Sequence, residues 1–296
     1  MPVVSVVIPT YRRTDKLLRA VGDALRQTIS DVEVVVHVVE EDRETIAALS
    51  AIEDPRVRWV VSPVKDGAGP ARNRAAAAST GPWIAFLDDD DEWMPHKLER
   101  QLAMAGQDRI VTCLSRVVTE TLEYISPGRP YDGSRSLDEW LFDRHSWMGG
   151  GEAMVQTSSL LVPAGLMREL PFATSRHDDW EFVIRASRVH GYRLVTVEEP
   201  LVIYYAGART PWRPAIGWAE SMADVMSPRA LSGFCLNSAT QAVGAEERST
   251  AFLTLLRAGL RLGRPTPKQL FAFFAMWAVP HEARWRLRQW LSTLRR

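Results

Sequence analysis

The chain has 296 residues, 46% of them hydrophobic, which is enough to bury a sizeable core in one large domain or in a domain with an appendage. Its 36 basic and 36 acidic residues give no net charge, and this composition excludes a mainly disordered chain. The two cysteines, Cys113 and Cys235, are too few and too far apart for a disulfide framework or a zinc site. We therefore expect reduced core thiols in a cytoplasmic protein.

The N-terminal half of the sequence alternates between strand-like and helix-like segments. Residues 3–8, 32–39, 57–62 and 83–87 are apolar and largely β-branched, as expected of parallel strands that are buried on both faces. A helix is predicted after the first strand, starting from a Thr14 cap, and another begins with Pro70 in its first turn and stops at Gly81. Strand and helix in alternation predict an α/β fold with a Rossmann-like, mostly parallel sheet.

The second half of the sequence predicts a further unit and an extension. Residues 105–152 show no clear pattern. They are followed by a predicted strand at 155–163, helices at 164–170 and 177–192, and strands at 192–197 and 200–205. After Gly207 the chain is rich in Pro, Gly and Ser and becomes helical from about Ala245. We expect a domain at 1–206, with halves 1–105 and 106–206, and a C-terminal linker and basic helical extension at 207–296.

Four consecutive acids, Asp88–Asp91, follow the fourth predicted strand. Ligands of open α/β sheets bind at the carboxyl ends of the strands, where Thr10 and residues 40–42 also lie. Carboxylates spaced Asp-x-Asp suit Mg²⁺ or Mn²⁺, which take oxygen ligands, although a solvated acidic turn is the alternative. Arg72 and Asn73 are expected in the first turn of the Pro70 helix, where a phosphate could bind, unless Arg72 lies on a solvated face. The combination suggests a metal-bound diphosphate.

The blocks VSVVIPTYRRTDKLLRAV, GPARNRAAAASTG, WIAFLDDDDEWMPHKLERQL, TSSLLVPAGL and HDDWEFVIRA resemble family 2 glycosyltransferases over about residues 3–205. The resemblance implies the nucleotide-diphospho-sugar transferase fold and a metal-dependent, inverting transfer of a sugar from a nucleoside diphosphate sugar to an acceptor. It implies Asp90, with Asp88, as ligands of Mn²⁺ or Mg²⁺. The implied nucleotide-sugar site comprises Pro9, Thr10, Tyr11, Arg12, Glu40, Arg72, Asp88, Asp89 and Asp90.

The sequence departs from the family pattern after the second strand, where HVVEEDRET replaces the usual pair of aspartates followed by Gly-Ser. Glu40 is the preferred counterpart of the acid that reads the nucleobase, and Glu41 and Asp42 are its rivals. The resemblance favours a UDP or dTDP donor. It leaves the acceptor open among a glycan, a lipid-linked sugar, a peptide and a small molecule.

The sequence HDDW contains the candidate catalytic acids Asp178 and Asp179. An inverting displacement needs a general base to remove the proton of the acceptor, and Asp179 resembles the family's base, with Asp178 beside it. A neighbouring carboxylate and partial burial would raise the pKa of the base. The alternative is that both acids cap a helix.

Three other enzyme or binding classes compete with this reading. A phosphatase also uses Asp-x-Asp after a buried strand, but it usually has Thr or Val where Glu92 stands. A nucleotidyltransferase would share the metal site and form pyrophosphate, and a sugar-nucleotide-binding protein would show no turnover.

Two further features of the sequence each allow two interpretations. Residues 147–154 (WMGGGEAM) form either a mobile lid or an ordinary connection.

Residues 248–296 contain ten lysines or arginines and one acid, about +9 in total, against about −9 for residues 1–247. The segment 266–296 either packs against the body or a second subunit of a homodimer, or binds an anionic membrane surface from the cytoplasmic side. No spanning segment is expected, because the longest apolar run, Leu270–Val279, has about half the ~20 residues needed. No nucleic-acid partner is expected either.

Overall fold

The structure, a computed structural model, describes residues 2–144, 146–147, 153–173, 177–207, 211–241, 243 and 247–278. The chain divides into two compact units. The first comprises Met1–Leu137 and Ala153–Ala208, and the second comprises Asp138–Glu152 and Arg209–Arg296. The predicted division into a glycosyltransferase-like domain at 1–206 and an extension at 207–296 stays a prediction.

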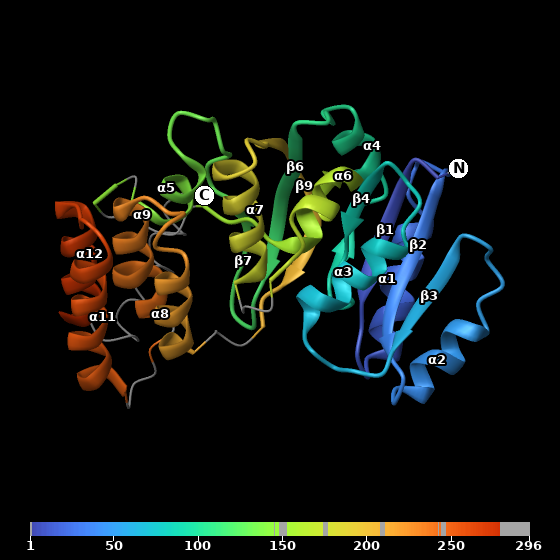
Figure 1. The fold of residues 1–296 in the computed structure, drawn as a ribbon, viewed down its shortest axis with the longest axis horizontal. Helices are drawn as coiled ribbons and strands as arrows, with labels where there is room; N and C mark the ends of the chain where they lie inside the picture. The colour runs from blue at the N-terminus through green and yellow to red at the C-terminus, as the bar shows by residue number, and fades with distance from the viewer. Residues whose placement is uncertain are drawn as a thin grey trace. The chain divides into compact units, whose positions relative to one another are not determined.

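The first unit is built on one sheet, in which the strands nearest the N-terminus are parallel (Figure 1). Their order is β3-β2-β1-β4, so the chain starts in the middle of this half and winds outward. The strand bounds are β1 Val4–Pro9, β2 Val32–Val39, β3 Val57–Ser62 and β4 Trp83–Phe86. Because every residue of β1 and β2 is buried, these strands are covered on both faces, as their continuous β-branched runs predict.

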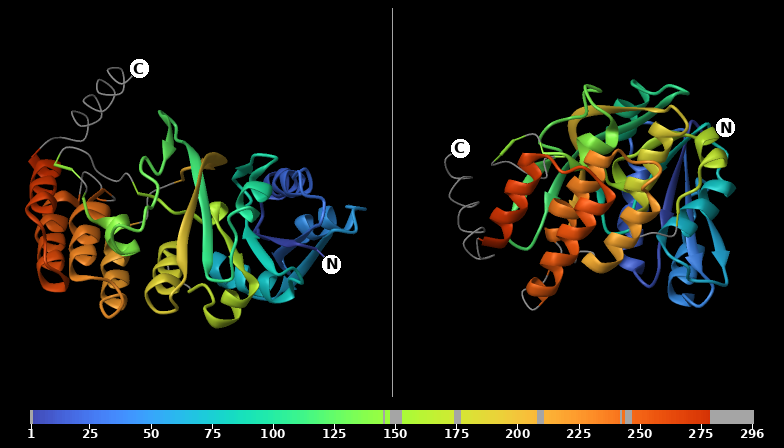
Figure 2. Two further views of the ribbon diagram at one scale, coloured as in Figure 1. Left: turned by 90° about the horizontal axis from the view of Figure 1, so that it is seen from above. Right: turned by 60° about the vertical axis from the view of Figure 1, so that its left-hand side comes forward.

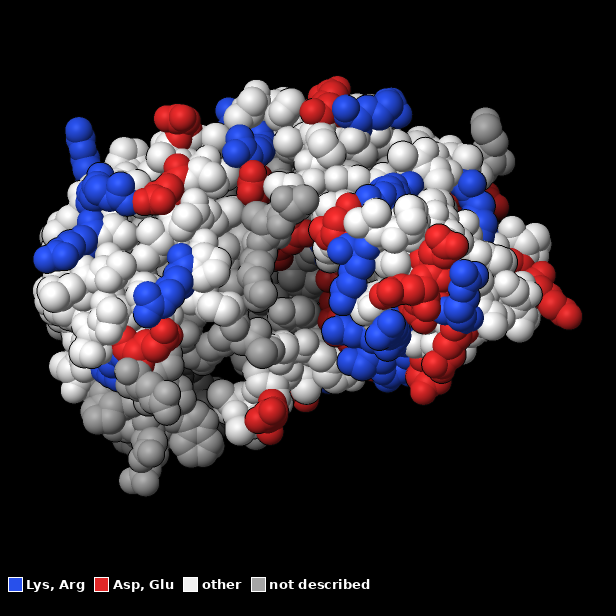
Figure 3. All heavy atoms as spheres, turned by 60° about the horizontal axis from the view of Figure 1, so that its bottom comes forward, with Lys and Arg blue, Asp and Glu red and all other residues white. Residues whose placement is uncertain are grey.

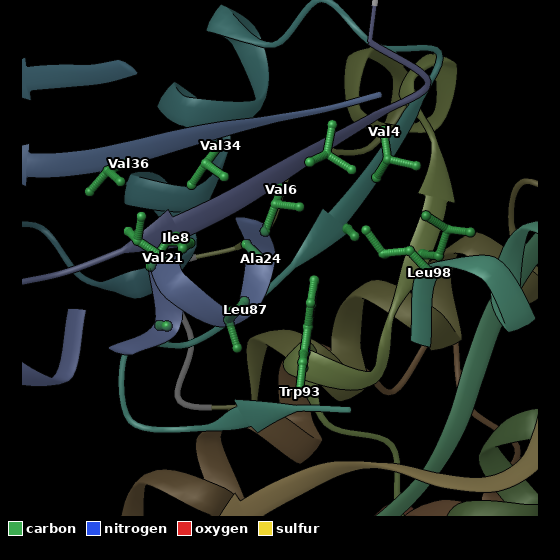
Figure 4. Close-up of a cluster of buried hydrophobic side chains, with 14 of the residues drawn as sticks. Val4, Val6, Ile8, Val21, Ala24, Val34, Val36, Leu87, Trp93 and Leu98 are labelled. Atoms are coloured by element: carbon green, nitrogen blue, oxygen red, sulfur yellow. The ribbon is translucent and has the colours of Figure 1, made fainter. Parts of the chain in front are cut away.

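Helices α1 (Thr14–Leu25), α2 (Arg43–Ser50) and α3 (Ala68–Ala78) connect these strands. One face of β1, formed by Val4, Val6 and Ile8, packs with α1 in the cluster shown in Figure 4. On the opposite face, Glu33 of β2 accepts hydrogen bonds from Ser5 and from Thr80, which follows α3. The sheet therefore carries a helix layer on each side.

The other half of the sheet is mixed. Strand β4 pairs antiparallel with β8, and the order continues β8-β6-β9-β5, with β7 beside β6. The strands are β5 Glu92–Trp93, β6 Arg109–Val118, β7 Glu123–Ser126, β8 Leu161–Pro163 and β9 Arg193–Tyr205, and the helices are α4 Lys97–Leu102, α6 Ala164–Glu169 and α7 Asp178–Arg188. The predicted α/β fold with a mostly parallel sheet flanked by helices is confirmed.

Three predictions about individual elements were wrong. The predicted strands at 192–197 and 200–205 are one strand, β9, because Cys113 and Leu114 of β6 pair with Val197 and Pro200 and the two glutamates between are accommodated as a bulge. Thr14 does not cap α1. Arg13 occupies the N-cap position, and the Thr14 hydroxyl lies 2.9 Å from the Thr45 hydroxyl. The predicted strand at 155–163 begins with a 3₁₀ turn, Thr157–Ser159, before β8.

The second unit is helical, and its helices begin earlier than the predicted Ala245 (Figure 2). They are α5 Leu137–Phe142, α8 Trp212–Ser221, α9 Pro228–Gly233, α10 Ala239–Gln241, α11 Arg248–Leu262 and α12 Pro267–Ala278. A π-helical segment, Phe234–Ser238, continues α9. Burial of Trp212 and Trp218 anchors α8 although its sequence contains proline and glycine. No helix in the described part of the chain is both long and apolar enough to cross a membrane.

Charged side chains of both signs share the surface drawn in Figure 3. Lysine and arginine side chains lie next to aspartate and glutamate side chains, most densely at the right of that view. Cys113 and Cys235 are both free and buried, as predicted.

Candidate active site

The ends of β1 and β4 are tied together by side chains. The Thr10 hydroxyl, just after β1, donates to a carboxylate oxygen of Asp89, just after β4, at 2.7 Å. The Arg13 guanidinium donates to Asp89 at 3.0 Å and to Asp90 at 2.8 Å. Lys16 is a second cation near Asp90, at 3.9 Å. The parallel strands thus place Thr10, Asp89 and Asp90 at one rim of the sheet, where the sequence predicts them.

Arg72 joins this rim to the candidate catalytic acids. Its guanidinium donates to Asp88 at 2.6 Å and to Asp178 at 2.7 Å, and only 4% of the residue is exposed. The guanidinium also lies over the ring of Phe172, 5.4 Å from its centroid. The buried Arg72 guanidinium therefore holds the carboxylates of Asp88 and Asp178 close together, although these residues are 90 positions apart in the sequence.

The expectation for Arg72 and Asn73 needs correction. Helix α3 begins at Ala68, so both residues lie beyond its first turn and away from the free N–H groups. Arg72 binds carboxylates, and the Asn73 amide donates to the Phe172 carbonyl and accepts from the Phe172 N–H, at 2.9 and 2.8 Å. These contacts fix the segment that leads into α7. The predicted position in the first turn is therefore wrong, and a contact between Arg72 and a phosphate stays a prediction.

Asp178 and Asp179 are the first two residues of α7, after His177 at the N-cap position. Each carboxylate accepts the N–H of the following residue, Asp179 at 3.0 Å and Trp180 at 2.7 Å, so both also satisfy free donors at the helix start. Loss of hydration on burial, followed by repulsion from Asp178, raises the pKa of Asp179 to about 7. Burial also raises the pKa of Asp178, against the opposing effect of Arg72. A group with a pKa near 7 can accept a proton efficiently at neutral pH.

Residues that the sequence did not single out support the acidic loop. The Ser158 hydroxyl donates to Asp91 at 2.5 Å and accepts from the backbone N–H of Asp88 at 3.0 Å. The Tyr205 N–H donates to the other oxygen of Asp91 at 3.3 Å. Asp91 therefore holds the loop in place. Burial raises its pKa to about 8.

Tyr204 of β9 is a further neighbour of these acids. Its pKa is raised, first by burial and then by the charges of Asp179, Asp91, Asp88 and Asp90. The tyrosine was not predicted, because nothing in the sequence brings residue 204 near residues 88–91 until β5 pairs with β9.

An open pocket of about 560 Å³ lies at the ends of β1 and β2. Of the residues after β2, Glu41 and Asp42 line it and Glu40 does not; the other lining residues are Arg12, Arg13, Thr14, Asp15, Lys16, Arg43 and Glu44. Asp42 accepts the backbone N–H of Arg12 at 2.5 Å and that of Thr45 at 3.4 Å. Tyr11 donates to Glu41, and its ring lies under the Lys65 ammonium, 3.7 Å from the centroid.

Among the described residues, no group of three or more His, Cys, Asp or Glu side chains could enclose a metal ion. Asp88 and Asp90 nevertheless fit a cation that takes one or two protein carboxylates and completes its shell with phosphate oxygens. Their side chains are 27% and 32% exposed, and the partner of Asp90, Arg13, is 49% exposed and therefore able to move. The donor set suits Mg²⁺ or Mn²⁺ only with a bound diphosphate. The candidate lid falls mostly at 148–152, outside the described residues.

The chain is similar in sequence to curated glycosyltransferases. The amylovoran biosynthesis glycosyltransferase AmsB of Erwinia amylovora is 29% identical over 220 residues, which cover 69% of this chain and 70% of that protein. Five further curated relatives match over less than half of their own length, and two others match over 66% and 61% of theirs.

Two solved structures share the fold. TarS of S. aureus in complex with UDP-GlcNAc has a TM-score of 0.60 at 15% identity, covering 88% of this chain and 83% of TarS. The mannosyltransferase PcManGT of Pyrobaculum calidifontis, in complex with GDP-Man and Mn²⁺, has a TM-score of 0.53 at 18% identity, covering 99% and 80%. The family model "Glycosyl transferase family 2" matches residues 5–152, half of the chain. The chain therefore belongs to glycosyl transferase family 2.

Proposed function

We propose that this glycosyltransferase moves a sugar, with inversion, from a UDP or dTDP sugar to an acceptor hydroxyl, with Mn²⁺ or Mg²⁺ at Asp88 and Asp90 and with Asp179 as the general base. The observation that carries the proposal is the buried Arg72, which binds Asp88 at 2.6 Å and Asp178 at 2.7 Å. Arg72 thus holds Asp88, proposed to bind the metal and the donor, close to Asp178, which precedes the proposed base.

The donor would lie along the rim formed by β1, β2 and β4. The nucleoside would contact Thr10, Tyr11 and the pocket residues Glu41 and Asp42. Pro9 and Arg12 would form the turn that holds these residues. Glu40 stays a candidate from the resemblance, although Glu41 and Asp42 line the pocket. A bound cation would neutralise the diphosphate and the charge that develops on it as it leaves. Asp89, held by Thr10 and Arg13, would keep Asp88 and Asp90 in position.

Asp179 supplies the proton transfer. The acceptor oxygen attacks the anomeric carbon, the bond from that carbon to the diphosphate oxygen breaks, and the acceptor proton passes to the Asp179 carboxylate. Asp178 is one residue away and anchored to Arg72, so its role would be to raise the pKa of Asp179 and hold its orientation. A nucleotidyltransferase would have no use for the base at Asp178 and Asp179, and this disfavours that alternative.

Release of nucleotide from a panel of nucleoside diphosphate sugars, with Mn²⁺ and with a chelator, tests the proposed reaction. We expect metal-dependent release of UDP or dTDP. Inorganic phosphate as the first product would indicate a phosphatase, pyrophosphate a nucleotidyltransferase, and binding without release a sugar-nucleotide-binding protein.

Asp90→Asn tests the metal site in the same assay. It removes one ligand charge, so the concentration of Mn²⁺ needed for half-maximal release should rise by roughly 10–100-fold. Asp108→Asn is the matched control, because Asp108 is an exposed acid paired with Arg193 and should leave the metal dependence unchanged. If Asp90→Asn behaves like Asp108→Asn, the metal is not bound at Asp90.

A further inference from the structure

Helix α12 exposes an apolar face. Its residues at helical spacing 267, 271, 274 and 278 are all exposed, and all four are apolar: Pro267, Phe271, Phe274 and Ala278. Phe271 and Phe274 are 46% and 49% exposed, and α12 contains a single charged residue, Lys268. A helix face that meets only water is normally polar. We therefore expect another molecule to cover this face.

The opposite face of α12 is already satisfied within the second unit. Gln269, Ala272 and Phe273 are buried, and Phe273 packs on Phe252, with ring centroids 5.2 Å apart. The Gln269 side chain donates to Asp143 and to the Arg229 carbonyl, at 2.8 and 3.0 Å. Because these contacts fix the rotation of the helix, Phe271 and Phe274 are held outward.

Trp147 extends the exposed aromatic surface. It is 50% exposed, and its ring meets that of Phe271 edge to face, with centroids 5.5 Å apart. Trp147, Phe271 and Phe274, from two separate segments of the second unit, form what we call the aromatic patch. Tryptophan is enriched at the boundary between water and lipid, and tryptophan and phenylalanine are typical of the apolar face of helices that lie in this boundary.

The sequence on both sides of Phe271 and Phe274 is rich in basic residues, which favours an anionic partner. Arg257, Arg261, Arg264 and Lys268 precede Phe271, and residues 279–296, which directly follow α12, contain five arginines and the one acid Glu282. Exposed aromatic residues combined with a strong excess of basic residues are typical of surfaces that bind anionic bilayers.

We propose that the aromatic patch docks the enzyme on an anionic lipid bilayer. The aromatic rings enter the headgroup region, and the basic residues nearby in sequence are attracted to the lipid phosphates. The inference does not depend on the donor, the metal or the base of the proposed reaction.

The test is cosedimentation of the full chain with vesicles of phosphatidylcholine alone or mixed with an equal amount of phosphatidylglycerol, at low and high salt. We expect capture by the mixed vesicles, less capture by phosphatidylcholine, and a decrease at high salt. Phe271→Ser/Phe274→Ser should bind the mixed vesicles about tenfold or more weakly, because two aromatic side chains no longer leave water. Ile125→Ser/Val189→Ser is the matched control, since it removes two exposed apolar side chains of the first unit. It should bind like the wild type.

Two results would overturn the proposal. One is equal capture of the wild type and the Phe271→Ser/Phe274→Ser variant, and the other is equal capture by both kinds of vesicle. A soluble dimer that this variant converts to monomers would also overturn it, because a second copy would then cover the patch. The melting temperature of each variant establishes that it is folded. Nucleotide release without vesicles should be unchanged in both variants, so failure to bind lipid is separable from failure of the proposed reaction.

Discussion

Arg72 connects two parts of the candidate active site through a single side chain. A guanidinium can bind two carboxylates in fixed directions, and Arg72 does so from a buried position in α3. The sequence indicated the importance of this arginine but assigned it to a phosphate. Its carboxylate partners depend on contacts across 16 and 106 positions, which no local pattern contains.

Replacement of Arg72 should destabilise the fold. Arg72→Met leaves Asp88 and Asp178 without their cation, and we expect the free energy of unfolding to fall by roughly 2–4 kcal/mol, since breaking a buried ion pair is costly. This loss is smaller than for a fully buried ion pair because the Asp88 side chain is 27% exposed. Urea denaturation at pH 7 measures it. Arg74→Met, which breaks the more exposed pair with Asp66, should cost no more than about 1 kcal/mol. Equal losses in the two variants would contradict the role of Arg72.

The pKa of Asp179 predicts how activity depends on pH. A base with a pKa of about 7 is protonated in acid, so kcat/KM should rise with pH and level off above about pH 7. A profile that is flat between pH 5 and 8, measured with a donor at saturating Mn²⁺, would contradict the assignment of Asp179 as the base.

The raised pKa of Asp179 also predicts that the stability of the fold decreases with rising pH, whereas activity increases. The folded state holds a proton on Asp179 that the unfolded state, with the ordinary pKa of 3.8, has released, so stability falls as pH rises through the window from about 4 to 7. Asp179→Asn should therefore be more stable than the wild type at pH 8 and similar near pH 4. Melting temperatures at the two pH values check this.

At the level of elements, α3 lies very close to the segment that leads into α7. A Cβ added at Gly69 would lie 2.2 Å from the Ala173 carbonyl oxygen and 3.2 Å from an Asp178 carboxylate oxygen. Gly69→Ala should therefore push this segment away from α3, reduce stability by about 1–3 kcal/mol and lower turnover by displacing the catalytic acids.

Gly165→Ala is the matched control for this prediction. Gly165 also lies in a helix, α6, but its added Cβ would meet only the end of the Arg168 side chain, at 3.8 Å. Alanine there should raise stability by roughly 0.5–1 kcal/mol. Denaturation and nucleotide release measure both variants, and a stable, fully active Gly69→Ala protein would refute the close approach.

The success of sequence prediction differed between elements for physical reasons. Strands β2 and β3 have the predicted bounds, because both are rich in β-branched residues. Only β2 is buried along its whole length. Strand β6 was missed because Thr112 and Ser115 interrupt its apolar pattern; both are buried and bonded, to Ser159 and Gln156. Helix α2 was missed because it has only eight residues.

At the level of the whole molecule, family membership and the identity of the donor and acceptor are separate questions. The family match covers residues 5–152, whereas the proposed catalytic acids lie beyond it, at the start of α7. The acids were found from the HDDW motif, and their position beside Asp88 depends on Arg72.

The most direct test of the account is sugar transfer, or slow donor hydrolysis, by Asp179→Asn, measured together with the affinity of the protein for the donor nucleotide and Mn²⁺. The account predicts unchanged affinity and a rate lower by about 10²–10⁴-fold, because the variant keeps the size of the side chain but cannot accept the proton. Asp178→Asn should lose less activity. Near-normal turnover in Asp179→Asn would contradict the account, and a loss confined to Asp178→Asn would move the base to Asp178.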